Sequence, residues 1–162
     1  MPIAVQAARH LRAEIDEVIV VVRTADAAQA FASESCRTVV CENAAEGMGA
    51  SLACGARAAG RADGYLVALA DMPFVRRTSI AAVRGALEGG AALAAPYFRA
   101  RRGHPVGIGG RFFEELAALT GDEGAKRVLA AHSAELVKIP VGDPGVIRDI
   151  DTPGDLAPPI RV

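Results

Sequence analysis

Short apolar runs rich in β-branched residues alternate with segments of helical periodicity along this chain, and that alternation limits the folds open to it. The run EVIVVVR at 17–23 is a continuous stretch of this kind, and we expect it to form a strand buried on both faces. Helical stripes precede and follow it, at 2–14 and 26–32. The alternation predicts an α/β fold, a Rossmann-like three-layer α/β/α arrangement around a mostly parallel sheet.

The other expected elements continue this order. We expect strands or apolar runs at 38–41, from Tyr65, at 91–97, 105–108 and 135–141, and from Val146. We expect helices at 51–59, 78–88, 111–119, 124–132 and 152–156. The basic turn at 99–103 is expected to introduce one antiparallel strand. No linker, repeat or low-complexity tract divides residues 1–162, so we expect a single domain.

Composition narrows the classes of partner. The 162 residues are 51% hydrophobic and 4% aromatic, which suits one domain with an aliphatic core. A formal net charge of -1 provides no general field for attracting nucleic acid or an anionic membrane. No apolar run approaches the roughly 20 residues of a membrane span, and the N-terminus lacks the pattern of a signal peptide. We therefore expect a cytoplasmic protein, with Cys36, Cys41 and Cys54 reduced.

Carboxylates follow two of the expected strands. Asp71 ends the segment YLVALADMP, and Asp149 and Asp151 lie in VIRDIDTP. Ligands of open α/β sheets collect beyond the carboxyl ends of strands, so acids at two such ends can share one divalent ion. Alternation along a strand places Asp149 and Asp151 on one face. The pattern suggests metal-dependent phosphate chemistry, although Asp71 could instead be a turn acid, and Asp151 could also cap a helix that begins at Thr152.

Common phosphate-binding signatures do not explain these acids. The sequence contains neither GxxxxGK[ST] nor a GxGxxG between a strand and a helix, so it supports neither a Walker-type NTPase nor a Rossmann dinucleotide site. The segment DIDTP is similar to the DxDxT motif of haloacid dehalogenase phosphatases. That motif opens its fold, whereas only 11 residues follow Asp151 here, so we reject this interpretation.

Five motifs taken in order carry a more specific resemblance. They are EGMGASL at 46–52, LADMP at 69–73, RGHPVG at 102–107, GDEGAK at 121–126 and DIDTPGDL at 149–156. Together they resemble the MobA/MocA-like nucleotidyltransferases, and within that family they are most similar to the molybdenum cofactor cytidylyltransferase branch. The resemblance covers almost the whole chain and implies the nucleotidyltransferase fold.

The resemblance implies Mg²⁺-dependent transfer of a nucleoside monophosphate. CMP would pass from CTP to the phosphate of the molybdopterin cofactor, with release of pyrophosphate. GTP as the donor or a sugar phosphate as the acceptor remain alternatives on the same fold. A further alternative, from another class, is a non-catalytic domain or chaperone that holds molybdenum cofactor. A molybdoenzyme or its chaperone is the expected protein partner.

The resemblance also predicts a missing part. Members of the family begin with a strand, a glycine-rich loop of the form LAAGxSxRMG and a lysine, which together hold the triphosphate. Pro2 matches the start of the family's first helix, so we expect this chain to lack that first strand and loop. A chain without this segment would have reduced or lost transferase activity. Strand edges left exposed could pair with a second copy, which predicts a homodimer.

The resemblance assigns roles to particular residues. Asp71 would be the principal Mg²⁺ ligand, completed by Asp151 and Asp149, with Asp71 and Asp151 as the catalytic residues. The residues expected to contact the nucleotide are Gly49, Ala50, Ser51, Ala70 and Asp71. The residues expected to contact the acceptor are Arg102, His104, Pro105, Asp122 and Gly124.

Plainer roles remain open for several of these residues. Ser51 and Asp122 could cap helices, and Arg102 could belong to a solvated basic turn. His104 could hold its own turn by a hydrogen bond rather than contact the acceptor. His10 and His132 lie on expected helices away from every motif, and we expect them to be structural or surface residues.

Overall fold

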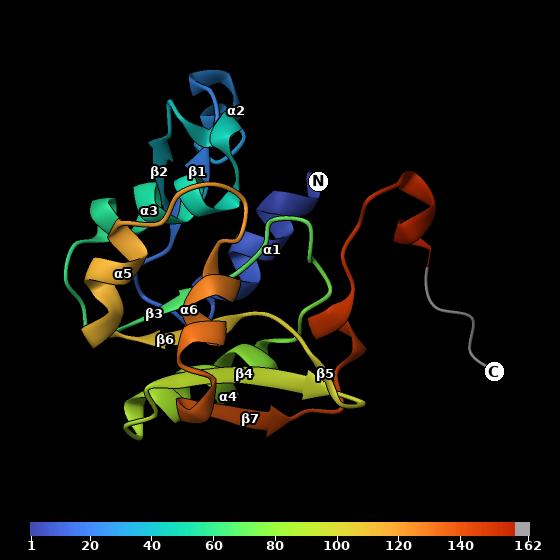
Figure 1. The fold of residues 1–162 in the computed structure, drawn as a ribbon. Helices are drawn as coiled ribbons and strands as arrows, with labels where there is room; N and C mark the ends of the chain where they lie inside the picture. Colours follow the sequence, from blue (N-terminus) through green and yellow to red (C-terminus); the bar gives the residue numbers. More distant parts are fainter. Residues whose placement is uncertain (158–162) are drawn as a thin grey trace.

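The computed structural model describes residues 1–157, and a five-stranded sheet forms its centre (Figure 1). Its strands are β3 (Gly64–Val67), β4 (Leu93–Phe98), β5 (Arg101–Arg102), β6 (Val106–Gly109) and β7 (Leu136–Pro140). They are ordered β3-β6-β4-β5, and β7 pairs with β4. The strands expected near Tyr65 and at 91–97, 105–108 and 135–141 are therefore confirmed, with shifted ends.

The pairing within this sheet differs from the expected mostly parallel arrangement, and that expectation was wrong. β6 lies between β3 and β4 and is antiparallel to both, and β5 is antiparallel to β4. Only the contact between β4 and β7 is parallel. One reversed strand at the centre of a sheet replaces a parallel contact with two antiparallel ones, and local sequence does not encode which strands become neighbours. The basic turn does introduce an antiparallel pair, as expected.

A second, two-stranded sheet contains the N-terminal strands. β1 (Ile19–Val22) and β2 (Arg37–Val40) are parallel, in register from Ile19 opposite Arg37 to Val22 opposite Val40. In β1 only Val22 is buried, so the expectation of a strand buried on both faces was wrong. Among residues 1–157 no strand lies between β1 and β3 to connect the two sheets. β1 and β3 therefore each have one edge without a paired strand. A two-stranded sheet buries less of each strand than a central position in a wide sheet does.

Helices cover both faces of the larger sheet. The helices are α1 (Ile3–Arg12), α2 (Ala25–Gln29), α3 (Met48–Ala59), α4 (Arg77–Glu88), α5 (Phe113–Ala117) and α6 (Ala125–Ala131), and the 3-10 helices are η1 (Ala44–Glu46), η2 (Gly110–Phe112), η3 (Ser133–Glu135), η4 (Pro144–Ile147) and η5 (Pro153–Leu156). Side chains of α3, α5 and α6 pack with Leu93 and Ile108 in the main core. On the other face α4 lies against Gly107 through Val83 and Leu87.

Helix α1 joins the two sheets. Val5 and Ala8 pack with Val22 of β1, whereas Leu11, one turn further on, packs with the cluster around Met72 that follows β3. The apolar stripe predicted for this segment therefore serves two cores. None of the helices in residues 1–157 is both long enough and apolar enough to cross a membrane.

The contact between α4 and the sheet leads to a prediction about Gly107. A Cβ added there would lie 2.8 Å from Cγ1 of Val83, a fully buried β-branched side chain, so we expect Gly107→Ala to lower the free energy of unfolding by about 1–3 kcal/mol. Gly85 of the same helix has open space around it, and Gly85→Ala should raise the free energy by about 0.5–1 kcal/mol. Urea unfolding of both variants measures the two changes. Equal effects would contradict the packing described here.

Candidate metal site

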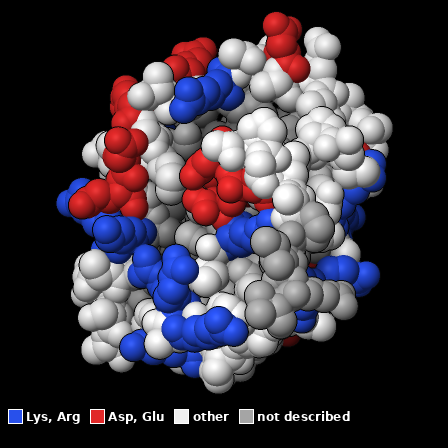
Figure 2. All heavy atoms as spheres, turned by 90° about the vertical axis from the view of Figure 1, so that its right-hand side faces the viewer, with Lys and Arg blue, Asp and Glu red and all other residues white. Residues whose placement is uncertain are grey.

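Three carboxylates lie together at the end of the sheet that follows β3. Asp71, Asp149 and Asp151 each offer an oxygen, and these oxygens all lie within 4.8 Å of one another. Asp71 is half-buried, and the other two are exposed. Figure 2 shows acidic side chains gathered near the centre of this side of the molecule, beside a hollow, with basic side chains below them. The structure thus brings together the three acids that the sequence predicted as metal ligands.

Irregular segments, not strands, carry these acids. β3 ends at Val67, and Asp71 lies beyond it in a turn that Met72 N closes on Leu69 O at 3.3 Å. The strand expected from Val146 does not form, because the η4 turn occupies Pro144–Ile147. Proline fixes its own φ near the value of such a turn and has no N–H to donate to a ladder.

The chain is extended after η4 and still alternates. Ile150 is buried, with Asp149 and Asp151 exposed on either side of it. The backbone N–H of Ile150 donates to the carbonyl oxygen of Asp71 at 2.9 Å, which joins the two acidic segments directly. The expected placement of Asp149 and Asp151 on one side is therefore seen without a strand.

A different carboxylate serves the C-terminal helix. Asp155 accepts hydrogen bonds from the backbone N–H groups of Asp151 and Thr152 at 3.2 and 2.7 Å and from Thr152 Oγ1 at 2.8 Å. These bonds lower the pKa of Asp155 below its usual range, the Thr152 hydroxyl bond having the largest effect. Asp155 thus satisfies the start of η5, and the Asp151 carboxylate lies in the acidic cluster instead.

The electrostatics of the cluster suit a divalent cation. Asp71 Oδ1 is buried and has no hydrogen-bond partner. Burial raises the pKa of Asp71, and the nearby charges of Asp149 and Asp151 raise it further. Carboxylate oxygens are the ligands that hard cations such as Mg²⁺ and Mn²⁺ take, and a cation among them would offset both the desolvation and the repulsion. The residues present therefore fit such an ion.

The segment predicted to contact the nucleotide is partly engaged in packing. Gly49 and Ala50 are buried and Ser51 is half-buried at the start of α3. The backbone N–H of Gly49 donates to Gly121 O at 2.7 Å. The N-cap of α3 is Gly47, so Ser51 lies inside the helix and does not cap it. Ala70, also predicted to contact the nucleotide, is exposed in the turn beside Asp71.

Close approach of two loops explains the glycines of that segment. A Cβ on Gly49 would lie 2.5 Å from Thr120 O, and one on Gly47 would lie 2.1 Å from Asp122 Oδ1. Gly47 also has φ of +128°, which favours glycine. The motifs EGMGAS and GDEGA are therefore neighbours in space, and their glycines are required by contact with each other.

The residues predicted to bind the acceptor fall into two places. Asp122 is exposed and Gly124 is buried in the loop that packs on Gly47. The N-cap of α6 is Gly124 without a side-chain hydrogen bond, so Asp122 does not cap that helix. Arg102 is exposed on β5. The structure does not gather these residues into one pocket.

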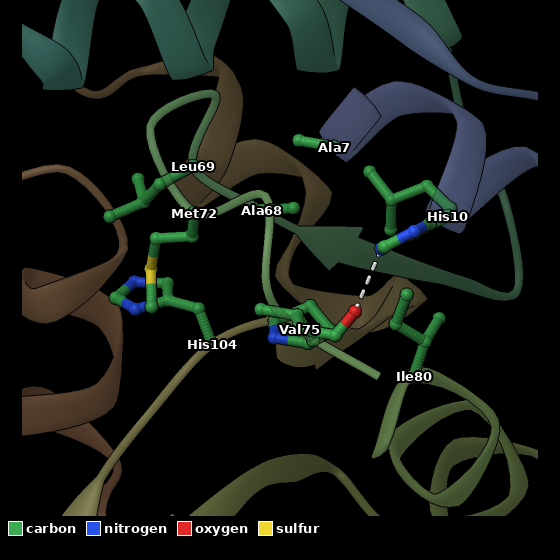
Figure 3. Close-up of a pocket in the computed structure, with 10 residues that line it drawn as sticks. Ala7, His10, Ala68, Leu69, Met72, Val75, Ile80 and His104 are labelled. Carbon is green, nitrogen blue, oxygen red and sulfur yellow. Dashed lines mark hydrogen bonds between the residues drawn. The ribbon is translucent and has the colours of Figure 1, made fainter. Parts of the chain in front are cut away.

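The other two predicted acceptor residues, His104 and Pro105, lie beneath the Asp71 turn. Together with Met72 they help to line a small cavity (Figure 3). Its volume of about 10 Å³ has room for about one water molecule. The backbone N–H of His104 donates to Val146 O at 2.8 Å. The turn is thus held by the backbone of His104, whereas its ring lies beside Met72.

His10 has a structural role, as expected, but it lies beside the motifs and not away from them. This residue of α1 lines the same cavity as His104, and its Nδ1 lies 2.9 Å from Val75 O (Figure 3). Helical spacing was the available signal, because His10 follows Ala7 by three positions on the face that also carries Leu11. His132, in contrast, is half-buried away from this cavity, and its Nε2 lies 2.8 Å from Oε1 of Glu115.

The setting of His104 predicts a pH dependence of stability. Burial, with a smaller effect of the Arg102 charge, lowers its pKa from 6.5 to about 4. Between about pH 4 and pH 6.5 the unfolded chain binds more protons at this histidine than the folded chain does. The free energy of unfolding is therefore unaffected by His104 above pH 6.5 and decreases as the pH falls from 6.5 to about 4. The loss is about 3 kcal/mol at most. Urea unfolding from pH 4 to 7 should show a smaller slope for His104→Asn, and an unchanged slope would contradict the assignment.

Several solved structures are similar to this chain in fold. Rv0371c from Mycobacterium tuberculosis H37Rv, also solved in complex with manganese, has a TM-score of 0.75 and 24% identity over 94% of this chain and 80% of its own. A nucleotidyl transferase from Methanothermobacter thermautotrophicus has a TM-score of 0.73 and 22% identity over 94% and 74%. Molybdopterin-guanine dinucleotide biosynthesis protein A from Archaeoglobus fulgidus has a TM-score of 0.57 and 18% identity, over 85% of this chain and 73% of its own.

These similarities show an α/β nucleotidyltransferase-like fold. No curated protein matches the sequence. The model of the MobA-like NTP transferase domain family matches residues 1–136, which include β1 to β6, the Asp71 turn and both glycine-rich loops. The chain belongs to the MobA-like NTP transferase domain family.

Proposed function

We propose that this protein transfers CMP from CTP to the phosphate of the molybdopterin cofactor in a Mg²⁺-dependent reaction that releases pyrophosphate. The observation that carries the proposal is the acidic cluster, in which Asp71, one of whose oxygens is buried without a partner, lies beside Asp149 and Asp151. Mg²⁺ binds proteins through one or two carboxylates and keeps positions for phosphate oxygens. Family membership supports nucleotidyl transfer as the reaction, and the choice of CTP and of the pterin rests on the sequence motifs.

The reaction needs no covalent nucleophile from the protein. A phosphate oxygen of the acceptor bonds to the α-phosphorus of CTP, and the bond from that phosphorus to the β-phosphate oxygen breaks to release pyrophosphate. Asp71, Asp149 and Asp151 would hold Mg²⁺, which when bound neutralises phosphate charge and aligns the two reacting oxygens. The task of the chain itself is to keep three carboxylates convergent and one oxygen of Asp71 shielded from water.

The basic side of the site is the proposed place of the acceptor phosphate. Arg102 is exposed on β5, and its charge acts on His104, which lies beneath the Asp71 turn. An arginine fork matches two phosphate oxygens. The surface around Gly49 and Asp122 is then left for the nucleotide base and ribose.

Replacing Asp71 tests the metal assignment. We expect Asp71→Asn to lower Mg²⁺-dependent pyrophosphate release by about 100-fold or more, because a metal ion contributes several kcal/mol of charge stabilisation. Asp63→Asn is a matched control, since Asp63 is exposed beside the opposite end of β3. Initial rates with CTP, molybdopterin and a series of Mg²⁺ concentrations provide the measurement. Full activity of Asp71→Asn would overturn the assignment.

Comparing substrates tests the identity of donor and acceptor. We expect pyrophosphate release with CTP and molybdopterin to exceed that with GTP and molybdopterin, and that with CTP and a sugar 1-phosphate. A higher rate with GTP would assign guanylyl transfer instead, and turnover only with the sugar phosphate would replace the pterin. Calorimetry with CTP and Mg²⁺ provides a second reading. Binding of molybdopterin without any CTP binding or turnover would support a carrier of the cofactor and contradict the proposal.

A further inference from the structure

Asp143 is the one carboxylate among the described residues that lies in the core. Only 3% of its surface is exposed. Its Oδ2 accepts from the backbone N–H of Arg76 at 2.8 Å and from Ser79 Oγ at 2.7 Å, and its Oδ1 accepts from the backbone N–H of Gly145 at 2.9 Å. The Arg76 guanidinium lies 3.7 Å from Oδ1. The proposed reaction gives this buried, fully bonded carboxylate no role.

These bonds connect two segments that are far apart in the sequence. Arg76 and Ser79 belong to the chain that leaves the Asp71 turn and enters α4, more than 60 positions before Asp143. Gly145 belongs to the η4 turn that leads to Asp149 and Asp151. A single side chain therefore joins the two segments that carry the acidic cluster.

The two segments stay in contact from Asp143 up to the cluster. A Cβ on Gly145 would lie 2.1 Å from Phe74 O, so the backbones touch there. The Arg148 guanidinium lies over the Phe74 ring, 4.4 Å from its centroid. At the far end Ile150 N donates to the carbonyl of Asp71. The contact has the Asp143 bridge at one end and the acidic cluster at the other.

No strand ladder fixes the distance between these segments. Asp71 lies in a turn beyond β3, and the residues from η4 to Asp151 belong to no strand. Each carboxylate of the cluster repels the other two, so the segments need an attachment that resists their separation. Hydrogen bonds to a charged carboxylate are stronger than those between neutral groups, and a buried carboxylate is costly to leave without partners. Asp143 has the position and the chemistry for this task.

We propose that Asp143 is a positioning residue for the metal site: its carboxylate holds the Asp71 segment at the spacing from Asp149 and Asp151 that a divalent ion requires. The inference rests on the proposed function, because it takes the acidic cluster as the metal site. Asp143 acts through the backbone of Arg76 and Gly145 and does not touch the ion. Residues that orient metal ligands typically change metal affinity by about 10- to 100-fold when replaced.

Mn²⁺ binding tests the inference without substrates. We expect Asp143→Asn to raise the Mn²⁺ dissociation constant by about 10-fold, because an amide cannot accept at both of its terminal atoms and one segment loses its bond. Electron paramagnetic resonance of free Mn²⁺ measures the constant, and circular dichroism verifies that the variant is folded. Ser79→Ala removes one donor only and should produce a smaller increase, of a few fold. It also decides the question if Asp143→Asn does not fold.

A destabilised variant distinguishes positioning from general loss of stability. Leu116→Ala leaves a cavity in the main core, on the face of the sheet opposite α4 and the bridge, so at matched stability it should bind Mn²⁺ as the unmodified protein does. Unchanged Mn²⁺ affinity in both Asp143→Asn and Ser79→Ala would overturn the inference and leave the metal site intact. An equal loss of affinity in Leu116→Ala would also overturn it. Failure of the unmodified protein to bind Mn²⁺, or binding that Asp71→Asn does not weaken, would contradict the proposed function itself.

Discussion

The attachment of the Asp71 turn to the segment before Asp151 is the constraint on which the site depends. Three carboxylates within 4.8 Å repel one another, and burial of Asp71 Oδ1 adds the cost of desolvation. The backbone bond between Ile150 and Asp71, the contact of Gly145 with Phe74 and the Asp143 bonds oppose that repulsion. The site is thus an arrangement that the surrounding fold enforces and that a bound cation would relax.

The sheet supplies the platform for this attachment. Reversal of β6 between β3 and β4 brings His104 and Pro105, which precede β6, beneath the turn that follows β3. Helix α4 then packs across Gly107 and begins next to Asp143. The support beneath the Asp71 turn therefore follows from the antiparallel strand that the basic turn introduces.

The glycines of EGMGAS are required where two loops of the chain approach each other closely. Sequence reasoning assigned Gly49 to contact with a ligand, and the structure shows its N–H bonded to Gly121 and its Cα against Thr120. Close backbone approach was the correct physical requirement, but the neighbour is another loop of the same chain. A ligand at this place would meet a surface that two motifs build together.

The sequence by itself determined the kinds and order of most elements and indicated the three acids that lie together. β-branched runs and helical stripes are local patterns, and β1, β2, α3, α4 and β4 lie within a few residues of the predicted positions. The acid that follows β3 and the alternating acids of DIDTP likewise predicted that Asp71, Asp149 and Asp151 lie together, although no strand precedes Asp149.

Only the tertiary structure decided which strands are neighbours, that Pro144–Ile147 is a turn rather than a strand, and that His10 joins His104 at one cavity. It also decided that Thr152 is the N-cap of the last helix and that Asp155 rather than Asp151 supplies the carboxylate of its capping box. Strand pairing, desolvation and the choice among carboxylates depend on groups far apart in the chain. Their energies arise only when those groups meet, so no local pattern records them.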